Sequence, residues 1–169
     1  MKSWAQMSDD FFDKHENSLL NFVAGLAVIM FIMFGGGILW PSLIFLLQQL
    51  MGEFTSKEFS ILFLVGALVI SLCITIPNVM ITRGKVGAAK FNKINIYIQY
   101  ACYLLLSLVY EDEYKWISVG FVIFPLLAHW LMVSAKYKAF LAFYEALRKD
   151  PEGFREKLKK AKHKRPMQR

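Results

Sequence analysis

The chain alternates between long apolar stretches and short clusters of charged residues. Four stretches contain no Asp, Glu, Lys or Arg, and they are residues 19–40, 59–82, 94–110 and 116–135. A helix needs about 20 apolar residues to cross the ~30 Å hydrocarbon layer of a membrane, and about 17 is the lower limit. The pattern therefore predicts an all-α protein, an integral membrane four-helix bundle over residues 19–135.

The composition supports this prediction because the chain is too apolar to bury itself. Of its 169 residues, 56% are hydrophobic and only 20% are charged. A soluble domain of this size has too little interior for so many apolar side chains, so lipid is expected to cover them. The first stretch is longer than the apolar core of a signal peptide and follows an acidic segment, residues 1–18, so we expect it to stay attached.

The positions of Lys and Arg predict the orientation in the membrane. The loop at residues 83–93 is basic and contains no acid, and residues 136–169 hold most of the other basic residues. In the loops at 51–58 and 111–115, acids outnumber lysines. Basic flanks stay in the cytoplasm. We therefore expect both termini and the middle loop to be cytoplasmic in a multi-pass protein of the plasma membrane, the inner membrane of a bacterium.

The segment after the first span is predicted to lie in the outer membrane interface. Trp40 falls where aromatic residues meet the headgroups, and Pro41 cannot donate to a continuing helix. Residues 42–51 are apolar but too few to cross again. The alternative is one helix that is only kinked at Pro41, because membrane helices tolerate proline. The candidates for contacts on the outer face are Trp40, Gln48, Gln49 and Glu53.

The cytoplasmic tail keeps a helical pattern beyond Ala135. Apolar side chains recur at helical spacing at Tyr137, Phe140, Leu141, Tyr144 and Leu147. The fourth helix is therefore predicted to continue inward. Asp150 and Pro151 form a helix-start signature. An amphipathic basic cytoplasmic helix is predicted after them, within the tail at 136–169.

Basic residues next to the cytoplasmic face are predicted to bind anionic lipid headgroups. Each Lys or Arg near such a surface contributes about 1 kcal/mol. A reader fold for nucleic acid does not accompany the basic tail, so we expect no nucleic-acid partner. The acidic N-terminal segment, residues 1–18, is expected to be interfacial. The headgroup candidates are Arg83, Lys85, Lys90, Lys159, Lys160 and Lys162.

Three polar side chains within the spans are predicted to share one depth. Asn78 lies five residues before Arg83, Gln99 six after Lys93, and His129 seven before Lys136. These offsets place them about 8 to 10 Å from the cytoplasmic boundary. Such a cluster indicates either a binding site or proton-sensitive switch, or hydrogen bonds between helices at about 0.6 kcal/mol each.

Small residues form a second pattern in the span at 59–82. Ala67, Ser71 and Thr75 are four apart, and Gly66 lies beside them. Such stripes let helix backbones approach closely. This helix-packing stripe is expected to face either another span or a partner.

Catalytic and metal-binding motifs are absent from the sequence, so neither an enzyme, a cofactor nor a metal site is expected. Cys73 and Cys102 lie in separate spans, and the three histidines are far apart along the chain. A structural zinc site or an exported disulfide is therefore not expected.

The function predicted from this architecture is binding to another membrane protein. Small inner-membrane proteins of the immunity, entry-exclusion or modulatory type have this build, although fold alone does not establish function. One alternative is an oligomeric channel or transporter lined by Asn78, Gln99 and His129. Another is an accessory subunit of a larger membrane complex. The expected partners are therefore a membrane protein or a second copy, together with membrane lipid.

Overall fold

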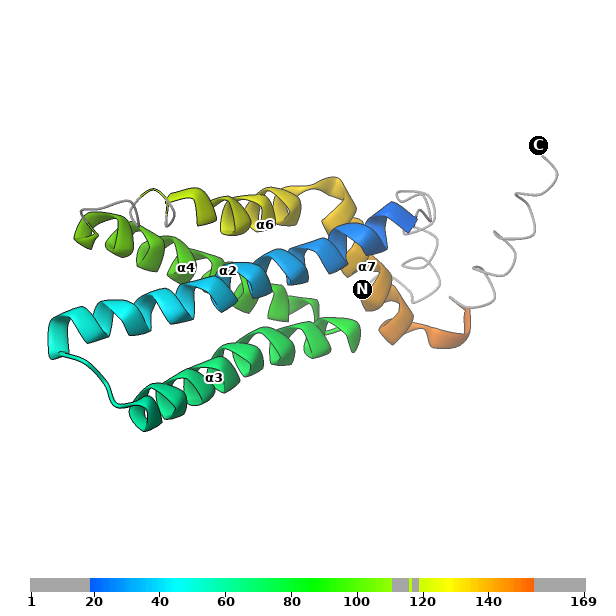
Figure 1. The fold of residues 1–169 in the computed structure, drawn as a ribbon. Coiled ribbons are helices and arrows are strands. Elements are labelled where there is room, and N and C mark those ends of the chain that lie inside the picture. Colours follow the sequence, from blue (N-terminus) through cyan, green and yellow to red (C-terminus); the bar gives the residue numbers. More distant parts are fainter. Residues whose placement is uncertain (1–18, 111–115, 117–118, 154–169) are drawn as a thin grey trace.

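The computed structural model describes residues 19–110, 116 and 119–153 of the chain. Within these residues the secondary structure is helical and contains no strand, which confirms the all-α prediction (Figure 1). The elements are α2 (Leu19–Met51), α3 (Ser56–Thr82), the short 3-10 turn η1 (Val86–Ala88), α4 (Ala89–Val109), α6 (Ile123–Val133) and α7 (Ala135–Lys149).

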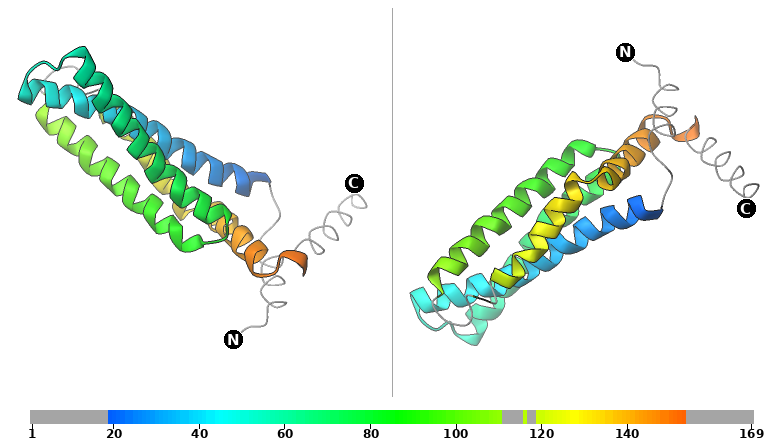
Figure 2. Two further views of the ribbon diagram at one scale, coloured as in Figure 1. Left: turned by 90° about the horizontal axis from the view of Figure 1, so that it is seen from below. Right: turned by 90° about the horizontal axis from the view of Figure 1, so that it is seen from above.

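Helix α2 is the centre of the arrangement and contacts α3, α4, α6 and α7. Figures 1 and 2 show α2, α3, α4 and α6 lying lengthwise beside one another, while α7 turns aside at the end where α2 begins. The main apolar core lies around Val28 and Ile32 of α2, with Ile74 of α3 and Ile96 of α4 packed against them. A second core joins Leu39 and Leu46 to Tyr103 and Leu106.

Two helices, α2 and α3, are long and apolar enough to cross a membrane. A third span results if Val119–Val133 and Ala135–Lys149 are counted together across their bend. Only 11% of the most apolar window of α3 is buried inside the protein. Its exposed apolar side chains, such as Leu64 at 67% and Leu68 at 61%, therefore favour an apolar surrounding.

The predicted end of the first helix at Trp40 is wrong. Helix α2 continues through Pro41 to Met51, so residues 42–51 are its last turns and not a separate segment. Pro41 has no N–H to donate to the carbonyl four residues earlier. The hydroxyl of the next residue, Ser42, donates to the carbonyl of Ile38 at 3.0 Å. The helix accommodates the proline, as in the alternative that the sequence left open.

The residues beyond Ala135 are helical, as predicted, but they form a separate helix and do not continue the fourth one. Helix α6 ends at Val133, and α7 leaves it at an angle of 63°. Ser134 between them has extended backbone angles, and its hydroxyl donates to the carbonyl of Leu131 at 2.6 Å. The same oxygen accepts from the N–H of Tyr137 at 3.2 Å. A single serine thus ends one helix and caps the next.

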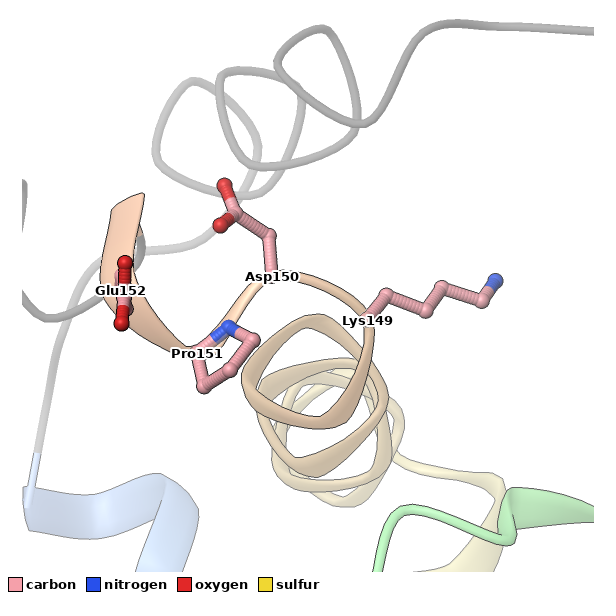
Figure 3. Close-up of a pocket in the computed structure, with 4 residues that line it drawn as sticks. All are labelled: Lys149, Asp150, Pro151 and Glu152. Atoms are coloured by element: carbon pink, nitrogen blue, oxygen red, sulfur yellow. The ribbon is translucent and has the colours of Figure 1, made fainter.

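The helix start predicted at Asp150 is confirmed for its first turn. The carboxylate of Asp150 accepts from the N–H of Gly153 at 3.1 Å, and Pro151 opens the turn between them. Figure 3 shows Asp150 at the end of α7, followed by Pro151 and Glu152. The predicted basic helix lies in residues 154–169, outside the described residues, as does the N-terminal segment 1–18.

Helix α3 begins with a reciprocal pair of hydrogen bonds. The hydroxyl of Thr55 accepts from the N–H of Glu58 at 3.3 Å, and the Glu58 carboxylate accepts from the N–H of Thr55 at 2.9 Å. The Thr55 hydroxyl also donates to the carboxylate at 2.8 Å. This capping box fixes where α3 starts after the loop from Gly52.

Lowering the pH is expected to loosen the first turn of α3. Hydrogen bonds from the backbone and hydroxyl of Thr55 hold the pKa of Glu58 below its ordinary value of 4.5. A lowered pKa stabilises the folded state above the unfolded value, and this stabilisation is lost as the pH falls through the lowered value. The protection factors of the first-turn amides, which correct for the intrinsic pH dependence of hydrogen exchange, should therefore fall below about pH 4.5. A Glu58→Gln variant cannot titrate there, so an equal fall in both proteins would contradict the prediction.

Candidate functional site

The three polar side chains predicted to form one cluster each contact a different set of partners. Gln99 faces α2, Asn78 faces α4, and His129 lies among tyrosines of α4. Polar contacts instead line the junction between α2 and α4, which we call the α2–α4 seam. The seam consists of Gln99, Tyr103 and Tyr110 on α4 with its cap, and of the α2 backbone that they contact.

Gln99 is the most buried polar residue of the seam, with 2% of its surface exposed. Its Nε2 donates to the carbonyl of Ile32 on α2 at 2.9 Å and to Oδ1 of Asn95 at 3.3 Å. Its Oε1 is buried and has no hydrogen-bond partner within the described part of the chain. The Gln99 amide therefore joins α4 to α2 through the Ile32 carbonyl, a group that in a helix normally accepts only from the backbone.

Two tyrosines extend the seam along α2. The hydroxyl of Tyr103 donates to the carbonyl of Gly35 at 2.8 Å, and that of Tyr110 donates to the carbonyl of Ser42 at 3.1 Å. Both acceptors lie on α2, seven residues apart like the tyrosines themselves. Seven residues are about two helical turns, so α2 and α4 keep a common register along the seam.

The seam explains two of the three consecutive glycines of α2. A Cβ atom on Gly35 would lie 2.3 Å from Oε1 of Gln99, and one on Gly36 would lie 3.4 Å from its Nε2. Both glycines are buried, whereas Gly37 is exposed and a Cβ there would meet nothing within 4 Å. Gly35 and Gly36 therefore allow the Gln99 side chain to lie flat against α2.

Asn78 belongs to a second polar contact near the start of α4. Its Oδ1 accepts from Nδ2 of Asn92 at 2.9 Å, and its own Nδ2 donates to the carbonyl of Ile74 at 2.7 Å. Asn92 is fully buried, and the hydroxyl of Tyr137 from α7 lies beside it but outside hydrogen-bonding geometry. This contact joins α3 to α4 at the place where α7 docks.

His129 makes edge-to-face ring contacts with α4. Its ring centroid is 5.7 Å from that of Tyr97 and 6.3 Å from that of Tyr100. The ammonium of Lys93 lies 5.7 Å from the centroid of Tyr97 on the same helix. His129 is half-buried, so these contacts form part of the α4–α6 junction and not a shared polar centre with Gln99.

The chemistry available in the seam is hydrogen bonding between neutral groups. The described residues contain no group of three or more His, Cys, Asp or Glu side chains that could hold a metal ion. The neutral amides and phenols of the seam hold helices together. This geometry favours the structural interpretation of Gln99 and Asn78 over a lined path.

Tyr103→Phe is expected to weaken the seam by about 0.6 kcal/mol and by at most about 1.7 kcal/mol. The change removes the hydroxyl that donates to Gly35 and keeps the ring. Unfolding in mixed detergent micelles measures the difference. Ser107→Ala is the matched control, because that hydroxyl is exposed and bonds only to Leu104 of its own helix. A loss no larger than that of the control would mean that the seam bond contributes nothing.

The helix-packing stripe is divided between two environments. Gly66 is buried under the indole of Trp40, because a Cβ there would lie 1.8 Å from Cε2 of the ring. Ala67, Ser71 and Thr75 are exposed on the other side of α3. We call these three residues the α3 outer stripe. Their small and hydroxyl-bearing side chains form a narrow surface that the described chain does not cover.

The remaining predicted contact residues have different exposures. Trp40 is half-buried against α3 with a buried indole nitrogen, so its N–H is not available to a partner on the outer face. Gln48 is half-buried, while Gln49 and Glu53 are exposed. Arg83, Lys85 and Lys90 are exposed at the opposite end, and Lys159, Lys160 and Lys162 lie outside the described residues.

Sequence reasoning missed Asn92, Tyr103 and Arg148 as structural contacts. Asn92 was grouped with the basic loop at 83–93, although α4 already starts at Ala89. Asn92 and Gln99 are seven residues apart, and so are Tyr103 and Tyr110. This spacing in the sequence could have predicted that the two members of each pair share one face of the helix.

No protein-family model, curated protein or solved structure matches this chain.

Proposed function

We propose that the chain is a four-span protein of the plasma membrane with both ends in the cytoplasm. The spans are α2, α3, α4 and the helix that includes α6. The distribution of charge among the described residues supports this orientation. One end of the molecule carries Glu53, Lys57 and Glu58. The other carries the basic residues Arg83, Lys85, Lys90, Lys93, Lys136, Lys138, Arg148 and Lys149.

The orientation is tested with cysteines at the two ends, in a background without Cys73 and Cys102. Glu53 and Gly87 are exposed, and a Cβ on Gly87 would meet nothing within 4 Å. A membrane-impermeant thiol reagent added to intact cells should label Glu53→Cys and leave Gly87→Cys unlabelled. Labelling of Gly87→Cys from outside would overturn the proposed orientation.

Its function in this proposal is to bind another membrane protein without catalysing a reaction. The observation that carries the proposal is the α3 outer stripe, Ala67, Ser71 and Thr75, which the described chain leaves exposed. Helix association in a membrane depends on close backbone packing and on hydrogen bonds between helices. A stripe of small and hydroxyl side chains offers both to a partner helix. Blocking or modulating a protein within the bilayer fits such a surface, as does a permanent accessory role.

The hydrogen bonds of the polar side chains within the helices weigh against the channel alternative. Gln99 and Tyr103 bond to carbonyls of α2, and Asn78 bonds to Asn92. These groups are engaged within the chain and would have to exchange partners to line a path. Solute or ion flux through vesicles containing the purified protein would favour the channel over partner binding.

Photo-crosslinking in native membranes tests the partner. A photoreactive residue replaces Ala67, Ser71 or Thr75 in turn, and matched controls replace Ile98 and Leu105, which are exposed on α4. The stripe positions should give one discrete protein adduct, identified by mass spectrometry, and the control positions should give lipid adducts. Lipid adducts alone from both helices would contradict partner binding. Adducts with a second copy alone would replace the partner with self-association.

A further inference from the structure

Helix α7 is held across the end of the helices by an aromatic cluster. Phe22 near the start of α2 makes edge contacts with Phe140, Phe143 and Tyr144 of α7, at centroid distances of 6.1, 4.9 and 6.3 Å. Tyr137 of α7 is also buried. Because α7 leaves α6 at 63°, its polar face is turned along this end of the molecule. Figures 1 and 2 show this placement, with α7 next to the start of α2 and the end of α3.

The last turns of α7 lie directly against the turn that follows α3. Gly84 has a positive φ of 75°, and a Cβ there would lie 2.4 Å from Cβ of Arg148 and 2.7 Å from the carbonyl oxygen of Tyr144. The guanidinium of Arg148 donates to the Gly84 carbonyl at 3.4 Å. This contact brings Arg148 beside Arg83 and Lys85, which flank Gly84 in the chain.

These three cations form a group with exposed side chains, which we call the turn cluster: Arg83, Lys85 and Arg148. The acid of α7 next to them, Glu145, is engaged by Lys149 in a pair one turn apart. Asp150 and Glu152 follow α7, and together with Lys149 and Pro151 they line a shallow pocket. Figure 3 shows the Lys149 side chain pointing away from both carboxylates. An anion is therefore expected at the Gly84 side of α7 and not in that pocket.

Exposed apolar side chains lie next to the turn cluster. Val79 is one turn before Arg83 and is 43% exposed, while Phe91 and Ile94 at the start of α4 are 57% and 53% exposed. A free anion would need only the cations. A ligand with a charged headgroup and acyl chains would use both the cations and this apolar surface.

We propose that the turn cluster binds the phosphate of an anionic phospholipid, with the acyl chains along Val79 and the start of α4. Arginine offers a planar set of donors to phosphate oxygens, and four of the five N–H groups of Arg148 are left after its bond to Gly84. The inference rests on the membrane placement in the proposed function but not on a protein partner. Lipid thereby holds α7 at the membrane surface.

Titration of the detergent-solubilised full chain with a short-chain phosphatidylglycerol tests the site. Each charge near an anionic lipid surface is worth roughly fivefold in binding, so Arg83→Gln with Lys85→Gln should weaken binding by roughly 25-fold. Neither side chain has a described intramolecular bond, so the variant keeps its contacts. The control changes Lys136 and Lys138 to Gln, which alters the net charge equally at the start of α7, about 15 Å or more from Arg148 along the helix. That distance exceeds the screening length of about 10 Å at 0.1 M salt, so binding should change little.

Three outcomes would overturn the proposal. Equal losses in both double variants would indicate diffuse attraction without a site. Equal affinity for phosphatidylcholine would remove the requirement for an anionic lipid. Competition by inorganic phosphate at the lipid's own concentration would assign the cluster to a soluble anion. Arg148→Lys keeps the charge and should still lose several-fold if planar donors matter. Crosslinking from the α3 outer stripe should be unchanged in these variants, so failure here is separate from failure of partner binding.

Discussion

Gly84→Ala is expected to detach α7 from the turn after α3 and to lower the free energy of unfolding by about 3 kcal/mol. The positive φ of 75° costs an L-residue about 1–2 kcal/mol. The new Cβ would also lie 2.7 Å from the backbone oxygen of Tyr144 and 2.4 Å from Cβ of Arg148. Neither atom is the end of a flexible side chain, and forced overpacking of this kind costs about 1–3 kcal/mol. Unfolding in mixed micelles measures the stability, and limited proteolysis within α7 measures its docking.

Two other glycines separate the contributions to this effect. Gly52 has a φ of 96°, and a Cβ there would meet nothing within 4 Å, so Gly52→Ala should show the backbone cost alone. Gly87 is equally open and has no positive φ, so Gly87→Ala should change stability by less than about 0.5 kcal/mol. Loss of stability in Gly84→Ala no greater than in Gly52→Ala would mean that α7 does not lie against the turn.

The apolar runs and charge clusters predicted where the helices lie. The run at 59–82 corresponds to α3, which the Thr55 capping box starts three residues earlier. The run at 94–110 corresponds to α4, which begins within the basic loop at Ala89. Lys90 and Lys93 are compatible with a helix because they lie on its exposed face. The charged residues therefore did not mark the end of a helix, and Asn92 was misplaced for that reason.

Sequence reasoning missed two helix boundaries. The proline that was expected to end α2 stays inside it, and the hydroxyl of Ser42 after it bonds back to the carbonyl of Ile38. Ser134 ends α6, although the apolar spacing of helices continues on both sides. A periodicity of 3.6 reports which residues share a face within each helix, but it contains no information on the angle between consecutive helices.

Pairing between distant residues could be predicted least. Gln99 was identified as a polar residue inside a span, but its partner is a backbone carbonyl 67 residues away, and every residue has such a carbonyl. Trp40 was assigned to the headgroup region because tryptophan prefers it, and the contact of its ring with Gly66 was not predicted. Both contacts depend on how the helices pack against each other, which one sequence does not specify.

Gly66→Ala is the most informative of the glycine changes, because Trp40 decides whether it raises or lowers the free energy of unfolding. In an α-helix, alanine is favoured over glycine by about 0.5–1 kcal/mol. Here the added Cβ would lie 1.8 Å from Cε2 and 2.0 Å from Cζ2 of the Trp40 indole, so the ring or α3 must move. We expect a net loss of about 2 kcal/mol, since overpacking costs about 1–3 kcal/mol. The measurement is unfolding in mixed micelles.

Trp40→Leu should reverse the effect of the same change. Without the indole there is room for a Cβ on α3, and Gly66→Ala should then stabilise the variant by up to about 1 kcal/mol. Gly37→Ala is the matched control on α2, because a Cβ there meets nothing within 4 Å and should act alike in both backgrounds. The coupling between positions 40 and 66 then measures the α2–α3 contact itself. A coupling near zero would place the two helices further apart than the Trp40–Gly66 contact requires, and α3 would lose its fixed position beside α2. The α3 outer stripe would then have no defined direction in which to face a partner.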